Sequence, residues 1–323
     1  MLYPLTLQPL FKERVWGGQR LADLYHKPLP AGASIGESWE VSDRPGDENI
    51  ITNGHFAGKS LRWLMTHHLS ELLGDTRPQG ERFPLLVKIL DAQDKLSLQV
   101  HPPAALASNL HGEPKTEMWY IAHAEPGAEL FVGLKPGVTR TAFEQAIPAG
   151  QLADCFHRIT VKSGDAMFLP SGRVHAIGAG LVIFEIQQNS DTTYRVFDWN
   201  RLGLDGKPRA LHIAESLASI DFNDVAPELI EPVTSTETNH IVRTLVQDPL
   251  FTVSHIALTG RGYSLPRLNK PQIIGALWGQ LTVTGSGSSV LLSPGQFTLI
   301  PACVSDANVS GDTSTSFILA NPQ

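Results

Sequence analysis

The chain has 323 residues, of which 42% are hydrophobic, so it is long enough for one large domain or two ordinary ones with apolar cores. Its 25 Lys and Arg residues against 32 Asp and Glu give a net charge of −7. This balance disfavours nucleic acid or an anionic membrane as a partner, while an anionic small molecule would need only a few local cations.

The N-terminal segment and the cysteines indicate a cytoplasmic protein. Residues 1–18 show no charged leader before an apolar stretch, so we expect no export signal. No run approaches the roughly 18 apolar residues typical of a membrane span. Cys155 and Cys303 match no metal or redox spacing, so we expect reduced structural thiols rather than a disulfide.

Helical periodicity is limited to a few segments. The clearest is residues 60–74, where Ser60 can cap a helix and apolar residues recur at helical spacing. Residues 139–159 predict two short helical pieces separated by Pro148. Residues 208–220 predict a helix that is opened by a proline.

Elsewhere the chain consists of short apolar runs separated by glycine and proline. In chain order these are residues 83–90, 118–124, 128–134, 166–172, 181–187, 251–258, 280–285 and 296–302. The pattern predicts an all-β barrel or sandwich with helical insertions.

The composition changes near residue 235. From Thr236 to the end, eight of 88 residues are charged, against 18% of the whole chain. We therefore predict two domains, residues 1–235 and 236–323, with the linker in residues 227–239.

A faint internal repeat relates the two parts. Residues 159–177 can be laid over residues 289–309 at a separation of 131, which pairs Gly164 with Gly295, Pro170 with Pro301 and His175 with Asp306. Strand, turn glycine, apolar strand and proline are typical of a small double-stranded β-roll. If His175 is a ligand in the first copy, the second copy has lost it.

Four side chains could form a ligand site. Gln99 and His101 are two apart in the run LSLQVHPP, so both face the same side of a strand. Glu117 begins an apolar strand, and His175 follows a Pro-Ser-Gly turn. Two histidines and a carboxylate suit zinc with an open position, and the same set binds non-haem iron or manganese. Taken alone, each histidine is more often a hydrogen-bonded or solvated residue than a ligand.

Candidate cations and a carboxylate accompany these residues. Lys88 lies within a buried strand, where a lysine is rarely unpaired and a structural ion pair is the alternative. Lys115 precedes Glu117 by two residues and should point to the same side of the pocket. Asp191 and Arg195 come from the stretch SDTTYR.

Three longer stretches carry a family resemblance. Residues 83–102, 112–134 and 169–203 resemble type I mannose-6-phosphate isomerases in their short bacterial form, and the similarity extends over roughly residues 8–225. The resemblance implies a cupin fold (a double-stranded β-helix, or jelly roll) with helical insertions. We expect a second, degenerate cupin-like β domain after it. The implied activity interconverts mannose 6-phosphate and fructose 6-phosphate with one bound metal per chain, usually Zn²⁺.

Carried over by motif, the resemblance implies that the metal ligands are Gln99, His101, Glu117 and His175. We expect the catalytic residues to be Arg195, Lys115, Lys88 and Asp191. We expect Ser97, Lys88 and Arg195 to bind the substrate, and the phosphate itself to be contacted by Ser97, Lys88 and Arg173. Arg195 is expected to help open the sugar ring or polarise an oxygen, with Asp191 orienting it through a charge-assisted hydrogen bond. The base that carries a proton between the two sugar carbons stays open among Lys115, Lys88, Asp191 and a water on the metal.

Two other functions compete with an isomerase. The His-Glu-His set also serves iron-dependent cupin oxygenases, whose pocket should be more apolar. A non-catalytic sugar-phosphate-binding cupin would keep the metal and lose turnover. For either an isomerase or a sugar-phosphate-binding cupin, we expect a small sugar phosphate as the partner and no nucleic acid or membrane. We expect the chain to be a monomer or a weak homodimer.

Overall fold

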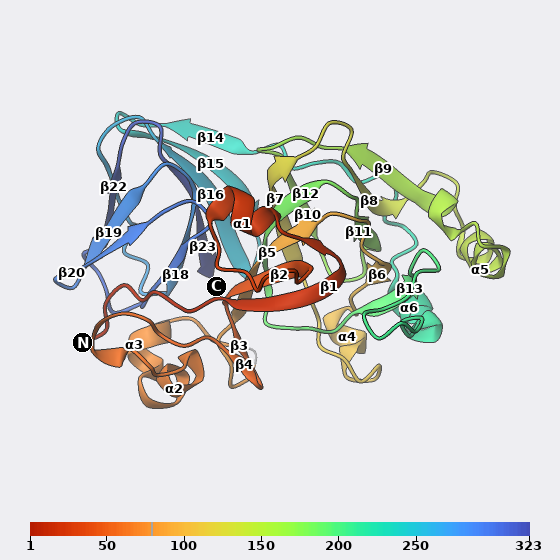
Figure 1. The fold of residues 1–323 in the computed structure, drawn as a ribbon, viewed down its shortest axis with the longest axis horizontal. Helices are drawn as coiled ribbons and strands as arrows, with labels where there is room; N and C mark the ends of the chain where they lie inside the picture. Colours follow the sequence, from red (N-terminus) through yellow and green to blue (C-terminus); the bar gives the residue numbers. More distant parts are fainter. Residues whose placement is uncertain (79) are drawn as a thin grey trace.

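The computed structural model describes residues 1–78 and 80–323. Its strands form four larger sheets, arranged as two sandwiches side by side (Figure 1). Across the described ranges, the helices are all too short or too polar to cross a membrane.

The first sandwich contains a six-stranded and a five-stranded sheet. In spatial order, the six-stranded sheet consists of β1 (Leu10–Gly18), β2 (Ile35–Val41), β5 (Leu85–Ala92), β12 (Leu181–Gln188), β7 (Glu117–Ala124) and β10 (Ala166–Leu169). The five-stranded sheet consists of β13 (Tyr194–Phe197), β6 (Leu98–Val100), β11 (His175–Ile177), β8 (Glu129–Leu134) and β9 (Phe156–Thr160). The strand pairings within both sheets are antiparallel.

The second sandwich repeats the arrangement without large insertions. Its six-stranded sheet consists of β14 (Val233–Thr236), β15 (His240–Gln247), β16 (Phe251–Leu258), β23 (Ser316–Pro322), β18 (Gln272–Trp278) and β21 (Phe297–Ile300). Its four-stranded sheet consists of β17 (Gly262–Ser264), β22 (Asn308–Gly311), β19 (Leu281–Gly285) and β20 (Ser288–Leu292). A small ribbon joins β3 (Asp43–Arg44) to β4 (Asp47–Glu48).

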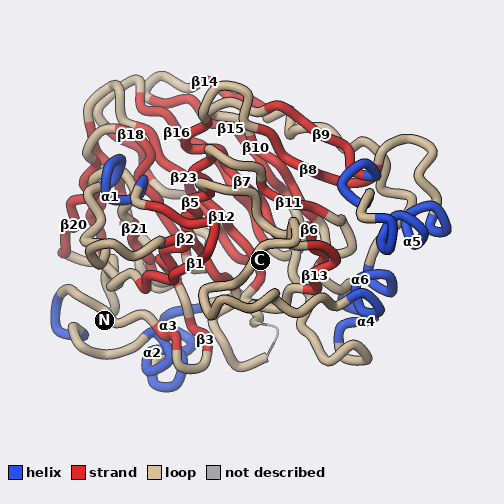
Figure 2. Tube along the Cα trace, turned by 45° about the vertical axis from the view of Figure 1, so that its right-hand side comes forward, coloured by secondary structure: helices blue, strands red, loops and turns tan. Residues whose placement is uncertain are grey.

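The helices lie at the periphery of the strands (Figure 2). They are α1 (Arg20–Tyr25), α2 (Leu61–His67), α3 (Leu69–Leu73), α4 (Ala104–Ala107), α5 (Arg140–Ala149) and α6 (Ile213–Ser219), with 3₁₀ turns at Gly54–Phe56 and Leu152–Cys155. Helices α4, α5 and α6 lie at the end of the first sandwich farthest from the second (Figure 1). The fold is therefore dominated by β-structure with helical insertions, as predicted.

Strand alternation divides the six-stranded sheet of the first sandwich into two different faces. Along β5, Val87 and Ile89 pack into the core shared with the second sandwich, whereas Leu90 packs inside the first sandwich. Lys88 lies on the same face as Leu90, because every second side chain of a strand points the same way. The inner face is thus apolar toward one end and polar toward the other.

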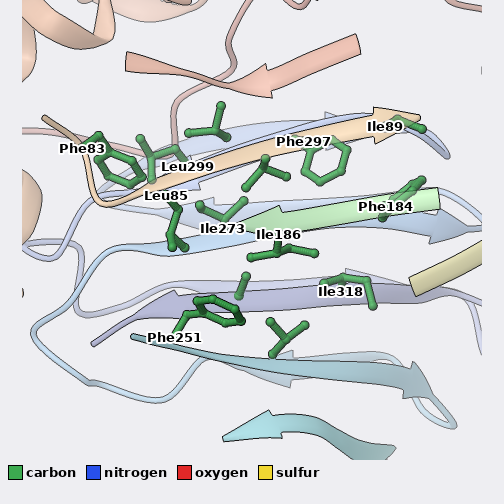
Figure 3. Close-up of a cluster of buried hydrophobic side chains, with 14 of the residues drawn as sticks. Phe83, Leu85, Ile89, Phe184, Ile186, Phe251, Ile273, Phe297, Leu299 and Ile318 are labelled. Atoms are coloured by element: carbon green, nitrogen blue, oxygen red, sulfur yellow. The ribbon is translucent and has the colours of Figure 1, made fainter. Parts of the chain in front are cut away.

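The two six-stranded sheets pack against each other through one apolar layer. Phe184 and Leu85 of the first sandwich belong to the same buried cluster as Phe251, Phe297 and Ile318 of the second (Figure 3). A bridge between Leu5 and Leu299 also ties the N-terminal segment to the second sandwich. The boundary predicted at residue 235 falls within β14, and the division into two domains stays a prediction.

The predicted helices differ in detail from the structure. Residues 60–74 form two helices, α2 and α3, that meet at His68, rather than one. Helix α5 continues through Pro148 to Ala149, because a proline in the last turn removes only one hydrogen bond before the helix ends at Gly150. The helix expected from Pro208 begins instead at Ile213, because the preceding backbone pairs with β13 through His212 N–H and Arg195 O. The capping role of Ser60 is confirmed by its hydrogen bond from Trp63 N.

Truncating the shared core should destabilise the whole molecule. Phe251 is fully buried between the sheets, so Phe251→Ala should lower the free energy of unfolding by about 3–5 kcal/mol. Leu291→Ala is the matched control, because Leu291 is 60% exposed. Urea unfolding followed by circular dichroism measures both, and an equal effect of the two variants would contradict the role of this layer.

Candidate metal centre and substrate cavity

Three buried side chains from different strands converge inside the first sandwich. His101 follows β6, Glu117 begins β7 and His175 begins β11. Each offers one possible ligand atom, and these atoms lie within 4.8 Å of one another. Glu117 Oε1 is 3.3 Å from His175 Nε2, and Glu117 Oε2 is 3.7 Å from His101 Nε2.

Backbone carbonyls set the protonation of both imidazoles. His101 Nδ1 is 2.8 Å from Thr192 O, and His175 Nδ1 is 2.9 Å from Arg173 O. Since a carbonyl only accepts hydrogen bonds, each Nδ1 carries the hydrogen, and each neutral ring keeps a lone pair on Nε2. Burial lowers the pKa of both rings, that of His175 to about 3. The Thr192 and Arg173 carbonyls thus orient two Nε2 lone pairs toward one point.

Glu117 supplies an ionised oxygen at the same point. Burial alone would raise the pKa of this carboxyl, but Lys115 and the two histidines outweigh burial and hold it well below its usual range. Lys115 Nζ is 2.7 Å from Glu117 Oε2. Within the described residues, neither carboxylate oxygen accepts a hydrogen bond of good geometry. Two imidazole nitrogens and a carboxylate with uncommitted lone pairs fit a divalent metal.

Gln99 lies beside this group, as the sequence predicts. It pairs in register with His175 and also with Arg195, so the three residues form a row across β11, β6 and β13. Its Nε2 is 3.4 Å from His175 Nε2, and its Oε1 accepts a hydrogen bond from Ser97 at 3.2 Å. Rotating the amide would present the oxygen to the metal point. The role of Gln99 as a fourth ligand stays a prediction.

A cavity of about 580 Å³ opens above this row, within the range of small-molecule sites. The predicted site residues that line it are Lys88, Ser97, Gln99, Lys115, Asp191 and Arg195. His101, Glu117 and His175 do not line the cavity themselves. Two lining residues contact them: Gln99 lies beside His175, and Lys115 pairs with Glu117. The sequence-predicted residues are thus brought together, although they come from five separate segments.

Two buried carboxylates beside Lys88, Glu37 and Glu185, were not predicted from the sequence. Lys88 Nζ lies 3.5 Å from Glu185 Oε1 and 3.7 Å from Glu37 Oε2, and 4.9 Å above the Trp39 ring. Lys88 therefore forms the structural ion pairs that a buried lysine needs, and it still lines the cavity. The signal was present in the sequence, because a charged residue interrupts the apolar run LVIFEIQ at Glu185.

Lys115 connects the two charged groups. Its Nζ is 4.0 Å from Glu185 Oε1 as well as 2.7 Å from Glu117 Oε2. Burial alone would lower the pKa of Lys115, but these two carboxylates outweigh it and raise that pKa. Burial raises the pKa of Glu185, against the attraction of Lys115 and Lys88.

The arginines are arranged differently from the expectation. Arg195 lines the cavity, but its Nη1 donates to Ala210 O at 3.0 Å and, among the described residues, no hydrogen bond joins it to Asp191, which is exposed. Arg173 does not line the cavity. Its guanidinium makes a bidentate pair with Asp224, with both distances 2.8 Å, so the suggested phosphate contact from Arg173 is wrong.

Comparison with known proteins identifies the family. The phosphomannose isomerase type I catalytic domain model matches residues 5–145. A mannose-6-phosphate isomerase of Streptococcus mutans is 35% identical over 313 residues, covering 97% of this chain and 96% of the relative. The chain belongs to the type I mannose-6-phosphate isomerase family.

Solved structures agree with this family and its fold. A mannose 6-phosphate isomerase from Bacillus subtilis superimposes with a TM-score of 0.91 at 31% identity, covering 99% of both chains. A zinc-bound mannose 6-phosphate isomerase has a TM-score of 0.77 at 17% identity, again over 99% of both chains, which shows a common fold. The cupin architecture implied by the sequence motifs is confirmed for this phosphomannose isomerase chain.

The charged network should make stability depend on pH. Burial opposes ionisation of Glu37, but Lys88 and Arg14 outweigh burial and lower its pKa from 4.5 to about 2. The ionised carboxylate therefore contributes stability above pH 4.5, up to roughly 3 kcal/mol, and that contribution is lost as the pH falls toward 2.

Glu37→Gln should remove this contribution. We expect the free energies of unfolding of wild type and variant, measured in urea, to differ most near about pH 6. The difference should shrink below pH 4.5 and vanish only as the pH falls toward 2. A difference that stays constant over this range would contradict the assignment.

Proposed function

We propose that this chain interconverts mannose 6-phosphate and fructose 6-phosphate in the cavity above His101, Glu117 and His175. The observation that carries the proposal is the pair of Nε2 lone pairs and the ionised carboxylate converging in a buried place beside a cavity of about 580 Å³. We propose that these three residues and Gln99 hold one divalent metal ion. The family relatives are named for the same isomerisation.

Zinc is the ion we propose for this site. Two imidazole nitrogens and one carboxylate oxygen are a donor set that Zn²⁺ prefers, with a position left for substrate. Iron and manganese accept the same donors, so the identity of the bound metal has to be measured. The wild-type protein should be analysed for all three.

The chain's own groups divide the remaining chemistry. A metal bound here would act as a Lewis acid that stabilises negative charge developing on the sugar oxygens. Moving the carbonyl between C1 and C2 also requires a group that takes a proton from one carbon and returns it to the other. The raised pKa of Lys115 keeps its amine protonated, which disfavours Lys115 as the base. We propose Lys88 for that proton, and the exposed Asp191 is a further candidate.

Cations and a hydroxyl account for the rest of the substrate. We propose that Arg195, beside Gln99 in the same row, polarises a sugar oxygen and contacts the phosphate. Ser97 and Lys88 line the same cavity and are proposed as further contacts to the substrate. An iron-dependent oxygenase would be expected to have a more apolar pocket, so the charged lining favours a phosphosugar substrate.

Removing one imidazole should abolish turnover and metal binding together. In His101→Ala we expect kcat to fall by at least about a thousandfold, because the charge-stabilising metal is lost, and the metal content per chain to fall with it. His123→Ala is the control. His123 lies on β7, at the opposite end of that strand from Glu117, and its Nε2 is 3.3 Å from Glu125 Oε1. A coupled isomerase assay and metal analysis of each purified protein measure both quantities.

Chelation tests the metal independently of mutation. Protein treated with a chelator should lose isomerase activity, and one equivalent of Zn²⁺ should restore it. A chain that binds metal stoichiometrically but turns over no mannose 6-phosphate with Zn²⁺, Mn²⁺ or Fe²⁺ would overturn the proposed function. That result would favour a sugar-phosphate sensor or an oxygenase.

A further inference from the structure

A second group of cations lies along the cavity wall, on the segment that joins β13 to α6. Arg209 comes from this segment and lines the cavity together with Arg14 and Arg195. The segment is held against β13, because His212 N donates to Arg195 O at 2.7 Å and Arg195 Nη1 donates to Ala210 O at 3.0 Å. The guanidinium groups of Arg209 and Arg195 are thus carried by backbones that are directly paired.

Asp198 fixes the orientation of Arg209. Arg209 Nε and Nη2 each donate to this carboxylate at 2.6 Å, a bidentate arrangement of charge-assisted hydrogen bonds. Asp198 is only 5% exposed. Because one edge of the planar guanidinium, Nε and Nη2, is committed to Asp198, the remaining nitrogen Nη1 is held in one place rather than free to rotate.

The same carboxylate also binds a second arginine. Arg201 Nη2 and Nε donate to Asp198 Oδ1 at 2.9 Å and 3.1 Å. One negative charge therefore serves two guanidinium groups, and Asp198 alone cannot neutralise both. Asp94 approaches Arg201 at 3.2 Å, but its side chain is 63% exposed, so water screens this pair. Asp198, Arg201 and Arg209 together therefore carry one net positive charge.

Arg209 keeps donors for a ligand. In residues 1–78 and 80–323, Arg209 Nη1 has no hydrogen bond to protein, and neither has Arg195 Nη2. Burial, followed by the positive charge of Arg209, lowers the pKa of Arg195, which reflects how near the two like charges lie. Like charges gathered in a cavity are stabilised when an anionic group binds between them.

The residues at the cavity floor are less available to a phosphate. Lys88 is shared between Glu37 and Glu185, and Ser97 Oγ already donates to Gln99. The phosphate is the most strongly charged part of the substrate and carries several acceptor oxygens. The phosphate is therefore better matched to the guanidinium nitrogens that donate to no carboxylate, Arg209 Nη1 and Arg195 Nη2 in the part of the chain that the structure describes.

We propose that Arg209, oriented by Asp198, binds the phosphate of the sugar phosphate together with Arg195, and that Asp198 is a positioning residue. This inference rests on the proposed function, because it assigns the phosphate end of the same substrate. Arg209 then determines affinity for the phosphorylated sugar, while the metal centre determines the chemistry.

The experiment separates binding from turnover. For Arg209→Ala, we expect KM for mannose 6-phosphate and the inhibition constant of inorganic phosphate to rise together, roughly ten- to hundredfold, as charge-assisted hydrogen bonds are lost. We expect kcat to stay within about threefold of wild type. Arg209→Lys keeps the charge without the bidentate fork and should lie between the two. Asp198→Asn should raise both constants by a smaller factor.

Arg140→Ala is the matched control, because Arg140 lies on exposed helix α5 and pairs with Glu144. It should leave KM, kcat and the phosphate constant unchanged. Thermal unfolding of each variant shows whether it is folded, and Arg209→Lys provides the test if Arg209→Ala is not.

Two results would overturn the inference. One is a folded Arg209 variant whose KM and phosphate inhibition constant stay within about twofold of wild type. The other is a fall in kcat with both constants unchanged, which would place Arg209 in the chemistry or the scaffold. Absence of turnover in wild type contradicts the proposed function instead. Calorimetric titration of wild type and Arg209→Ala with inorganic phosphate then tests this inference directly, because it needs no turnover.

Discussion

The ionised carboxylate of Glu117 is the charge around which the interior of the first sandwich is arranged. A fully buried carboxylate is costly unless other groups stabilise its charge. Lys115 at 2.7 Å and two imidazoles at 3.3 Å and 3.7 Å surround it in this structure. Lys115 in turn lies near Glu185, which pairs with Lys88, which reaches Glu37. The charges thus form one chain of alternating sign, in the order Glu117, Lys115, Glu185, Lys88 and Glu37.

Such a polar network needs a rigid apolar frame. The inner face of β5, β12 and β7 is apolar where Leu90, Ile183 and Ile121 pack, and polar where Lys88, Glu185 and Glu117 lie. The opposite face packs on the second sandwich through Phe184, Phe251 and their neighbours (Figure 3). Each strand is therefore fixed from behind by apolar packing, which holds its polar side chains at set distances.

The cavity has two parts. Its floor consists of Lys88, Ser97, Gln99 and Lys115, and its wall is the segment that carries Arg209. The floor is built on strands in the middle of the sheets, where ligand atoms must be held close together for a metal. The wall is built on the segment between β13 and α6, where Arg209 lines the cavity and the buried Asp198 holds it from behind. In the Bacillus subtilis isomerase of similar structure the whole fold is retained at 31% identity.

Much of this molecule could be predicted from the sequence. The apolar runs predicted the central strands, because period-two alternation and short length are local properties of a chain. Residues two apart on one strand share a face, which predicted that Gln99 and His101 converge. The family resemblance then implied Glu117 and His175 as the other metal ligands. That family resemblance is confirmed by the comparisons.

Only the tertiary structure decided which charges meet. Glu185 and Glu37 are far apart in the sequence, and nothing local shows that both contact Lys88. Arg173 follows a turn next to a ligand motif, yet Asp224 binds it away from the cavity. The sequence determined the strands through local periodicity and the candidate ligands through motifs that resemble those of the family. Strand register and the packing of distant segments decided the partners, because ion pairing depends on a few ångströms in space rather than on separation along the chain.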